Sequence, residues 1–414
     1  MNLIQKLALD VGPILRALTR SRAGAVLIAL QCAITLAIIT NAIFIIQDRL
    51  SKMARPSGVD VDNVFSMNAI PFAPHFDSKA SIEADLRALR ALPGVVDAAV
   101  INAIPLLESG ASSVYAARPD AKANEFIGAA RYESDAHALN TLGLKLIAGR
   151  DFREDEIRGR EINSQWENPV VILSKAYADK LFPPDGGSAG TAVGKTLYDG
   201  NQTPIPIVGI VERAQAPWIG WGQLEYSAFF SNYRLSFARY IVRAAPGERD
   251  RLMAEVEKVL TSSSSGRLIV SIKSQTEIEA RTYGEYRAMA VILLSVIVLI
   301  VIITGLGIVG LASFNVNARK KQIGTRRALG AQRSDIVRYF LVESWLITTA
   351  GALVGCGLSF ALSYWMVNTF DLPPLDWRYI PVGVVFLWVL GQLAVLVPAR
   401  RASLLAPALA TRSV

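Results

Sequence analysis

The chain has 414 residues, of which 52% are hydrophobic, and its mean hydropathy is +0.34. These values argue against a wholly soluble protein, because a soluble domain rarely needs so much apolar surface to fill its core. The formal net charge is +8, yet residues 48–287 are close to neutral, with 28 Lys and Arg against 30 Asp and Glu. The positive charge therefore lies outside the one segment large enough to form a soluble domain, which argues against nucleic-acid binding.

Four apolar stretches are long enough to cross a bilayer, since about 20 residues at 1.5 Å per residue span roughly 30 Å of hydrocarbon. They are residues 23–47, 288–314, 340–370 and 380–397, and Glu343 is the only charged residue in them. The first stretch follows a basic segment, as a signal peptide would. It is longer than the apolar region of a signal peptide and has no evident small-residue cleavage site, so we expect a retained anchor.

Lys and Arg are concentrated in three short segments beside these spans. They are Lys6, Arg16, Arg20 and Arg22 before the first span, Arg319, Lys320, Lys321, Arg326, Arg327, Arg333 and Arg338 between the second and third, and Arg400, Arg401 and Arg412 after the fourth. Short cytosolic flanks retain positive charge, so both termini are predicted to be cytosolic. The predicted segments are residues 1–22 (cytosolic), 23–47 (first span), 48–287 (extracytoplasmic domain), 288–314 (second span), 315–339 (cytosolic link), 340–370 (third span), 371–379 (outer loop), 380–397 (fourth span) and 398–414 (cytosolic tail).

The extracytoplasmic segment has the alternating helix and strand pattern of an α+β domain. Residues 81–92 predict an amphipathic helix with Ser81 as its N-cap, and the apolar run 95–104 predicts the following strand. Residues 170–182 predict a strand that enters a helix, and residues 239–272 predict a strand, a helix and a strand. A domain of this length is large enough to contain two subdomains.

Residues that carry catalysis or bind metals are sparse. His75 and His137 lack the clustered Cys, His or carboxylate neighbours of a metal site, so we interpret them as ordinary surface or hydrogen-bonding histidines. Both cysteines, Cys32 and Cys356, fall within predicted spans, so no disulfide framework is expected in the outer domain. No nucleophile elbow, paired acids or Cys–His set appears, and the sequence therefore predicts neither an enzyme nor a cofactor in this chain.

Small residues in the second and third spans predict close helix packing. Gly305, Gly307 and Gly310 form a G-x-G-x-x-G pattern, but it lies inside a span and not at the strand-to-helix turn of a dinucleotide site. Gly351 and Gly355 form a G-x-x-x-G pair in the third span. A functional hinge is the alternative for both sets.

Glu343 is the one acid at the edge of the membrane. An ionisable residue in a span is a candidate for a functional role. Glu343 lies within a turn or two of the cytosolic end of its span, where Arg338 or Arg400 could pair with it. We therefore favour a structural ion pair or hydrogen bond.

The cytosolic link has the most distinctive sequence in the chain. It reads Ala318-Arg319-Lys320-Lys321-Gln322-Ile323-Gly324-Thr325-Arg326-Arg327-Ala328-Leu329-Gly330-Ala331, and Phe340-Leu341-Val342-Glu343 follows. It resembles the signature of the MacB/FtsX-type permeases of ATP-binding cassette (ABC) transporters, in which a basic "REIGxRRALGA" segment precedes "FLxE" at the head of the third span. Gln322 departs from the family, which usually has Glu there, and this affects any partner contact that relies on that carboxylate.

Further matches occur in the same order as in that family. Residues 142–144, 149–152, 170–174, 181–183, 194–197 and 207–211 resemble its periplasmic core domain, and residues 398–402 resemble its C-terminal ending. The resemblance covers nearly the whole chain. It implies an integral membrane α-helical protein with four transmembrane helices and a large α+β extracytoplasmic domain, in the bacterial inner membrane.

The activity that the resemblance implies is mechanotransmission. In this mechanism, ATP binding by a separate cytosolic subunit draws the spans together and moves the outer domains. ATP and Mg would be bound by that ABC ATP-binding subunit, present in two copies, and not by this chain. The ATPase-coupling segment would comprise Ile323, Gly324, Arg326, Arg327, Ala328, Leu329, Gly330 and Ala331.

The resemblance also concerns the route of the substrate and the role of the link. It implies that substrate need not cross between the spans, and the spans fit this because they lack the several buried polar groups expected of a hydrophilic site at the bilayer midplane. Composition alone favours a membrane-surface helix for the link, held by anionic headgroups, whereas the resemblance favours a helix that binds a partner protein.

The implied partners are a second copy of the chain or a similar permease, and in a Gram-negative cell a periplasmic adaptor that reaches an outer-membrane channel. Efflux of a peptide, antibiotic or other hydrophobic substrate is the favoured cargo hypothesis. Lipoprotein release and control of cell-wall hydrolases are alternatives with the same architecture. A membrane-anchored sensor is the alternative from another class, but its output domain would have to fit in a cytosolic segment of about 25 residues.

Overall fold

The computed structural model describes residues 22–161, 169–183, 192–263, 266–370 and 372–404. The chain divides into two compact units, which are described separately below. The helical unit comprises Met1–Ser51 and Arg287–Val414, and the outer unit comprises Lys52–Tyr286. The domain boundaries predicted at residues 47/48 and 287/288 fall close to this division.

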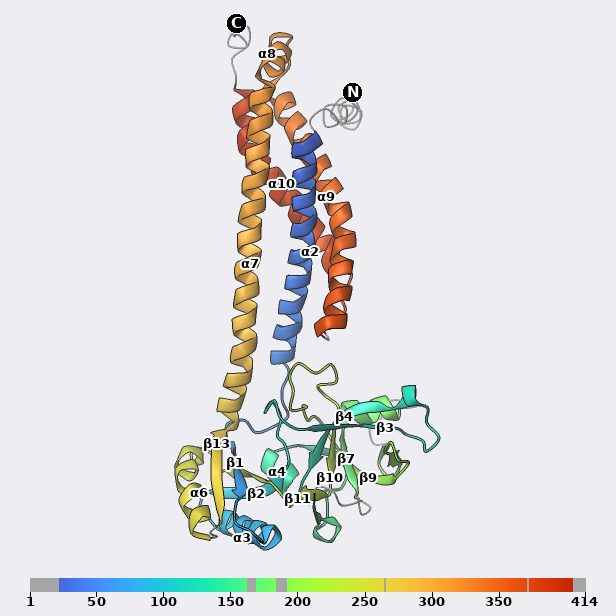
Figure 1. Cartoon of the computed structure of the whole chain (residues 1–414), viewed down its shortest axis with the longest axis vertical. Coiled ribbons are helices and arrows are strands. Elements are labelled where there is room, and N and C mark those ends of the chain that lie inside the picture. Colours follow the sequence, from blue (N-terminus) through green and yellow to red (C-terminus); the bar gives the residue numbers. More distant parts are fainter. Residues whose placement is uncertain (1–21, 162–168, 184–191, 264–265, 371, 405–414) are drawn as a thin grey trace. The chain divides into compact units, whose positions relative to one another are not determined.

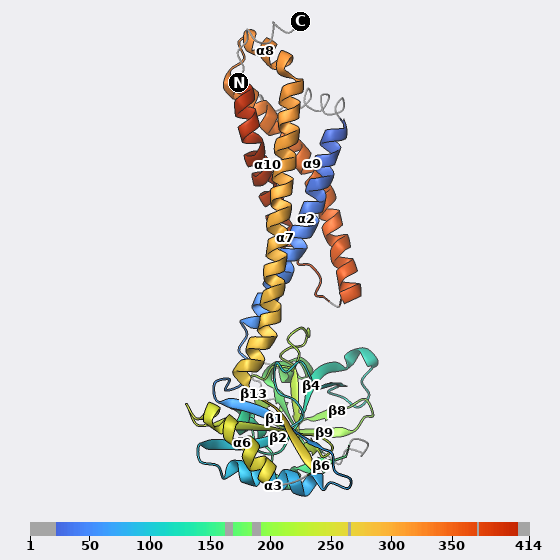
Figure 2. The ribbon, with the colours of Figure 1, turned by 60° about the vertical axis from the view of Figure 1, so that its left-hand side comes forward.

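Four long helices form the helical unit, and each is long and apolar enough to cross a membrane (Figures 1 and 2). They are α2 (Arg22–Met53), α7 (Gln275–Ala318), α9 (Arg333–Phe370) and α10 (Tyr379–Ser403), and a short helix, α8 (Lys320–Ala328), connects α7 to α9. The helices extend beyond the predicted apolar stretches into polar and basic residues, and α7 does so furthest, since it begins at Gln275. The predicted cytosolic link is therefore largely helical.

The outer unit contains a four-stranded antiparallel sheet that is built from both ends of the unit. Its elements are β1 (Val64–Pro71), α3 (Ser78–Arg90), β2 (Val95–Ile101), β12 (Ala238–Ala244), α6 (Arg249–Ser263) and β13 (Arg267–Ser274). The strand order is β13-β1-β12-β2, with antiparallel neighbours throughout. This β-α-β-β-α-β order is the ferredoxin-like arrangement, and we call it the first sheet module.

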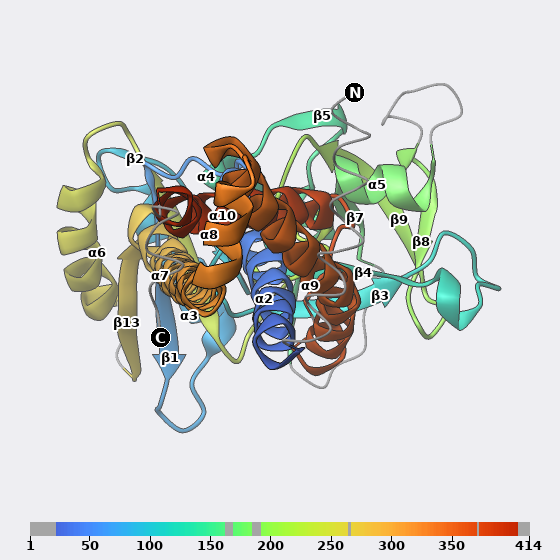
Figure 3. The same cartoon turned by 90° about the horizontal axis from the view of Figure 1, so that it is seen from above.

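The described residues between β2 and β12 form an inserted module, which lies beside the first one in Figure 3. Its elements are β3 (Ala111–Tyr115), η1 (Ala123–Glu125), β4 (Ile127–Glu133), α4 (Ala138–Leu142), β5 (Leu146–Gly149), η2 (Glu154–Glu156), β6 (Arg158–Arg160), β7 (Val171–Ser174), α5 (Lys175–Leu181), β8 (Thr196–Tyr198), β9 (Pro204–Val211), β10 (Ser227–Phe230) and β11 (Asn232–Arg234). The main sheet is mixed, with the order β3-β4-β10-β7-β9-β5 and β8 on β9. The expected α+β class is therefore confirmed.

The N-cap predicted for the helix over residues 81–92 is wrong. Helix α3 begins at Ser78, and Asp77 is its N-cap, because the Asp77 Oδ1 accepts a hydrogen bond from the Ala80 N–H at 3.0 Å. Ser81 lies inside the helix and is buried. The apolar periodicity located the helix but did not distinguish between two residues that both favour N-caps.

A buried charge cluster joins the inserted module's strands. The Glu133 side chain at the end of β4 is fully buried and accepts hydrogen bonds from Arg131, Arg160 and Arg234. Arg160 lies on β6 and Arg234 on β11, so this carboxylate fixes the two-stranded β11-β6 sheet to β4. Burial disfavours the charged carboxylate, but Arg131 first, and then Arg234 and Arg160, hold the pKa of Glu133 below its ordinary value.

Candidate functional site

The predicted coupling segment forms α8 and the turn that follows it. Ile323 and Gly324 are buried in the helical unit, and Ile323 belongs to the same apolar cluster as Ile336 and Phe340 of α9. Gln322 and Arg326 lie on the exposed part of the helix. The face of α8 that carries Ile323 and Gly324 is thus packed into the bundle, where α8 contacts α10 and Ile323 shares an apolar cluster with α9, while Gln322, Arg326 and Leu329 are exposed.

Local sequence determines where α8 ends. Gly330 has a φ of +97°, in the left-handed region that favours glycine. Its N–H donates to the Arg327 carbonyl at 3.2 Å, and the Ala331 N–H donates to the Arg326 carbonyl at 3.0 Å. This pair of bonds is the Schellman motif, which satisfies the last carbonyls of a helix.

The Schellman turn presents an apolar side chain to solvent. Leu329 is the C-cap of α8 and is 83% exposed. Ala328 beside it is also exposed, and Arg326 and Arg327 carry positive charge on the same turn. An exposed leucine surrounded by guanidinium groups can enter an apolar groove whose rim carries carboxylates.

A polar network connects the end of α7 with α9. The Arg319 Nη1 donates to Glu343 Oε2 at 3.1 Å and to the Tyr339 hydroxyl at 3.2 Å. The Arg326 guanidinium carbon lies 5.1 Å from the centroid of the Tyr339 ring. Glu343 is therefore held in an ion pair, and its partner in the described part of the chain is Arg319, whereas the sequence predicted Arg338 or Arg400.

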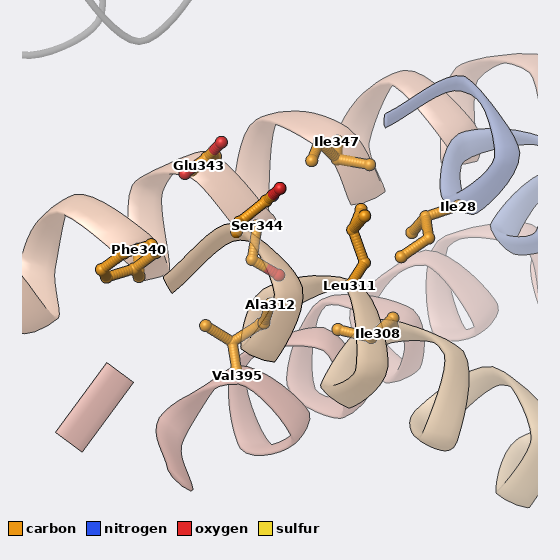
Figure 4. Close-up of a pocket in the computed structure, with 10 residues that line it drawn as sticks. Ile28, Ile308, Leu311, Ala312, Phe340, Glu343, Ser344, Ile347 and Val395 are labelled. Atoms are coloured by element: carbon orange, nitrogen blue, oxygen red, sulfur yellow. The ribbon is translucent and has the colours of Figure 1, made fainter. Parts of the chain in front are cut away.

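The cavity beside Glu343 is small and mostly apolar (Figure 4). Its volume is about 30 Å³, enough for roughly one water molecule. The lining residues are Ile28, Ile308, Leu311, Ala312, Asn315, Phe340, Glu343, Ser344, Ile347 and Val395. A peptide or an antibiotic does not fit there.

The spans contain more buried polar groups than the sequence predicts. Thr35 of α2 and Thr304 of α7 share a hydrogen bond at 2.8 Å. Thr40 donates to the Ser359 hydroxyl at 3.1 Å, and the Asn41 amide donates to the Ser359 carbonyl at 3.1 Å. The prediction that such groups are lacking is wrong, but the groups named here pair between helices.

The glycines of the third span contact α2 closely. A Cβ atom on Gly351 would lie 2.5 Å from the Ala29 carbonyl oxygen, and one on Gly355 would lie 3.0 Å from the Ala33 Cα. A Cβ on Gly307 would lie 2.6 Å from the Gln31 side chain. These positions fit the packing role that the sequence suggested for them.

Gly305 and Gly310 are placed differently. A Cβ on Gly310 would meet no described atom within 4 Å, and one on Gly305 would meet only Leu390, at 3.9 Å. Close packing within the described part of the chain therefore does not require glycine at either position, and the packing role of these two glycines stays a prediction.

Gly351→Ala is expected to destabilise the helical unit, because its Cβ displaces the α2 backbone, at a cost of about 1–3 kcal/mol. Gly310→Ala has room for its Cβ and gains up to about 1 kcal/mol of helix propensity. The retention of monodisperse full-length protein after heating in detergent measures both effects. Unchanged or increased heat stability of Gly351→Ala would contradict the close packing at Gly351.

Neither histidine belongs to a cluster of metal ligands among the described residues. The His137 Nδ1 lies 2.9 Å from Asp97 Oδ1, and its Nε2 lies 3.1 Å from Glu154 Oε1. His75 has a φ of +57° in the loop before α3. His137 thus makes contacts within the outer unit that sequence spacing did not predict.

Two family models match the chain. The model described as MacB-like periplasmic core domain matches residues 25–259, and the model described as FtsX-like permease C-terminal matches residues 294–407. The macrolide export ATP-binding/permease protein MacB of Chromobacterium violaceum is 27% identical over 278 residues, covering 64% of this chain and 40% of that protein. The chain thus spans about 40% of the length of this relative.

A shorter relative and a solved structure also match. The uncharacterized ABC transporter permease YknZ of Bacillus subtilis is 24% identical over 288 residues, covering 66% of this chain and 67% of that protein. The solved structure is the crystal structure of the periplasmic region of MacB from Actinobacillus actinomycetemcomitans, whose sequence is 14% identical to this chain. The match covers 56% of this chain and 97% of the chain in that structure, with a TM-score of 0.32.

Proposed function

This chain belongs to the family of ABC transporter permeases that join a MacB-like periplasmic core domain to an FtsX-like permease domain, and we propose that it works by mechanotransmission. A separate subunit would bind and hydrolyse ATP. This chain would convert the movement of that subunit into movement of its outer unit. The observation that carries the proposal is the surface of α8 and its Schellman turn.

The α8 surface has the features that a coupling contact requires. Ile323 packs in the apolar cluster that the long helices share, so a force on α8 reaches those helices. Leu329 supplies an exposed apolar contact, and Arg326 and Arg327 supply charges that pair with acids on a partner. The competing interpretation is a membrane-surface helix held only by anionic headgroups. Such a helix requires the basic residues but not a leucine that projects from its end.

The proposed topology follows from the basic flanks. With α8 and both termini in the cytosol, the outer unit lies in the periplasm of an inner-membrane protein. ATP and Mg would be bound by two copies of the ATP-binding subunit, and this chain itself would contribute no cofactor site. A second copy or a similar permease would complete the complex, and a periplasmic adaptor with an outer-membrane channel would extend it.

The proposed cargo is a peptide, an antibiotic or another hydrophobic substrate, exported without passing between the spans. Thr35 pairs with Thr304 and Thr40 with Ser359 between helices, and the cavity at Glu343 has room for about one water, which supports a route outside the bundle. Lipoprotein release and control of cell-wall hydrolases use the same architecture and differ in the further partners they need.

The test is purification of the tagged chain from its native membrane in a mild detergent, with mass spectrometry of the accompanying chains. A stoichiometric ABC ATP-binding subunit is the expected result. An adaptor in the same preparation would favour efflux over the two alternatives. Absence of any ATPase, under conditions that preserve other membrane complexes, would overturn the permease role and favour a membrane-anchored sensor.

A further inference from the structure

The joint between α7 and α8 is a single residue. Helix α7 ends at Ala318, and Arg319 departs from helical geometry, with φ −106° and ψ 16°. Hydrogen bonds continue across the joint, since the Arg319 N–H donates to the Asn315 carbonyl at 3.1 Å and the Ile323 N–H donates to the Arg319 carbonyl at 3.0 Å. The backbone alone therefore leaves one point at which α8 can bend against α7.

The side chain at this joint reaches across to α9. Arg319 donates to both Glu343 and Tyr339 through the same nitrogen, and its side chain is 15% exposed while that of Glu343 is 4% exposed. The guanidinium group of Arg326 in α8 lies over the ring of Tyr339. One guanidinium thus joins the end of α7 to α9, and Tyr339 joins α9 to α8.

The charge balance makes this contact specific. Among the described residues, Arg319 is the cation paired with Glu343, and Glu343 Oε1 has no hydrogen-bond partner. Removing Arg319 would leave a buried carboxylate uncompensated, so the two groups strongly favour staying together. The apolar contact of Ile323 with α9 is non-directional and does not define an angle.

We propose that Arg319, Glu343 and Tyr339 form a positioning lock that holds α8 at a fixed angle to α7 and α9. A force applied to α8 then moves the three helices together and does not bend the Arg319 joint. The lock residues are positioning residues, because Glu343 is buried and does not reach a cytosolic partner. This inference rests on the proposed coupling role of α8.

Hydrogen–deuterium exchange of the full-length chain in detergent tests the lock. Glu343→Gln keeps the shape but removes the charge, and we expect the α8 amides to exchange at least about tenfold faster, while the α10 amides stay unchanged. Exchanging the pair, as Arg319→Glu with Glu343→Arg, restores slow exchange. Gln392→Leu is the matched control. It removes a polar contact outside the lock, the hydrogen bond from the Gln392 amide of α10 to the Leu341 carbonyl of α9 at 3.3 Å, so the exchange of the α8 amides should not change.

Three outcomes would overturn the lock. They are unchanged α8 exchange in Glu343→Gln, an increase spread equally over α9 and α10, and an increase that the exchanged pair does not reverse. The proposed function has its own readout, because Glu343→Gln should still co-purify with the ATP-binding subunit that accompanies the wild-type chain. Loss of the lock and absence of a partner ATPase are thereby distinguished.

Discussion

Leu329→Asp should release the ATP-binding subunit from the chain. Leu329 is 83% exposed at the end of α8, and a leucine that becomes buried in a partner contributes up to about 3 kcal/mol, or roughly a hundredfold in affinity. Aspartate loses that contribution and also places a carboxylate in the apolar groove proposed for the ATP-binding subunit. Co-purification of the subunit with the tagged variant measures the loss, and the amount of the variant in the membrane reports its insertion.

Leu404→Asp is the matched control for this prediction. Leu404 follows α10, lies on the same predicted side of the membrane and is 63% exposed, so the substitution makes the same chemical change on another surface. The subunit should remain bound to this variant. Equal losses in the two variants would indicate a general effect of charge near the bilayer, and full retention by Leu329→Asp would contradict the coupling role of the Schellman turn.

Glu133→Gln should destabilise the outer unit by about 3–5 kcal/mol, because it leaves three arginines beside a buried neutral amide. The loss should appear as cleavage at lower urea concentration when the full-length chain is subjected to pulse proteolysis in detergent. The control is Glu125→Gln. Its ion pair with Arg118 is exposed, at 40% and 61% of the respective side chains, so its loss should cost at most about 1 kcal/mol.

Acid should reproduce part of the Glu133→Gln effect. The folded-state pKa of Glu133 lies below its ordinary value, so its stabilising contribution is present above the unfolded-state pKa and is lost as the pH falls through the folded-state pKa. The free energy of unfolding of the wild-type outer unit should therefore fall with acidification below about pH 4.5, and that of Glu133→Gln should fall less. Parallel pH profiles for the two proteins would contradict the role of the buried carboxylate.

Local physical chemistry explains which features could be predicted from the sequence. A membrane-spanning helix needs only enough consecutive apolar residues, so four stretches predicted four helices. The end of α8 follows from one glycine, Gly330, that adopts a left-handed conformation readily. The link and outer-domain motifs identified the family, and the two family models support that assignment.

Pairings between distant residues could not be predicted in this way. Arg338 and Arg400 were the predicted partners of Glu343, and its pairing with Arg319 depends on how the end of α7 lies against α9. Thr35 and Thr304 are 269 residues apart, and single polar residues within apolar runs gave no sign that they would meet. Gly310 and Gly351 look alike in sequence, but only Gly351 faces another backbone.

The sequence by itself determined the spans, their basic flanks, the α+β character of the outer unit and the family, because these depend on the composition and order of short segments. Only the tertiary structure decided the insertion of one sheet module between β2 and β12, the three arginines around Glu133 and the lock at Arg319. These depend on which surfaces meet after folding. Burial then makes these ion pairs specific, because a charge removed from water is stabilised only by the partners that the packing places beside it.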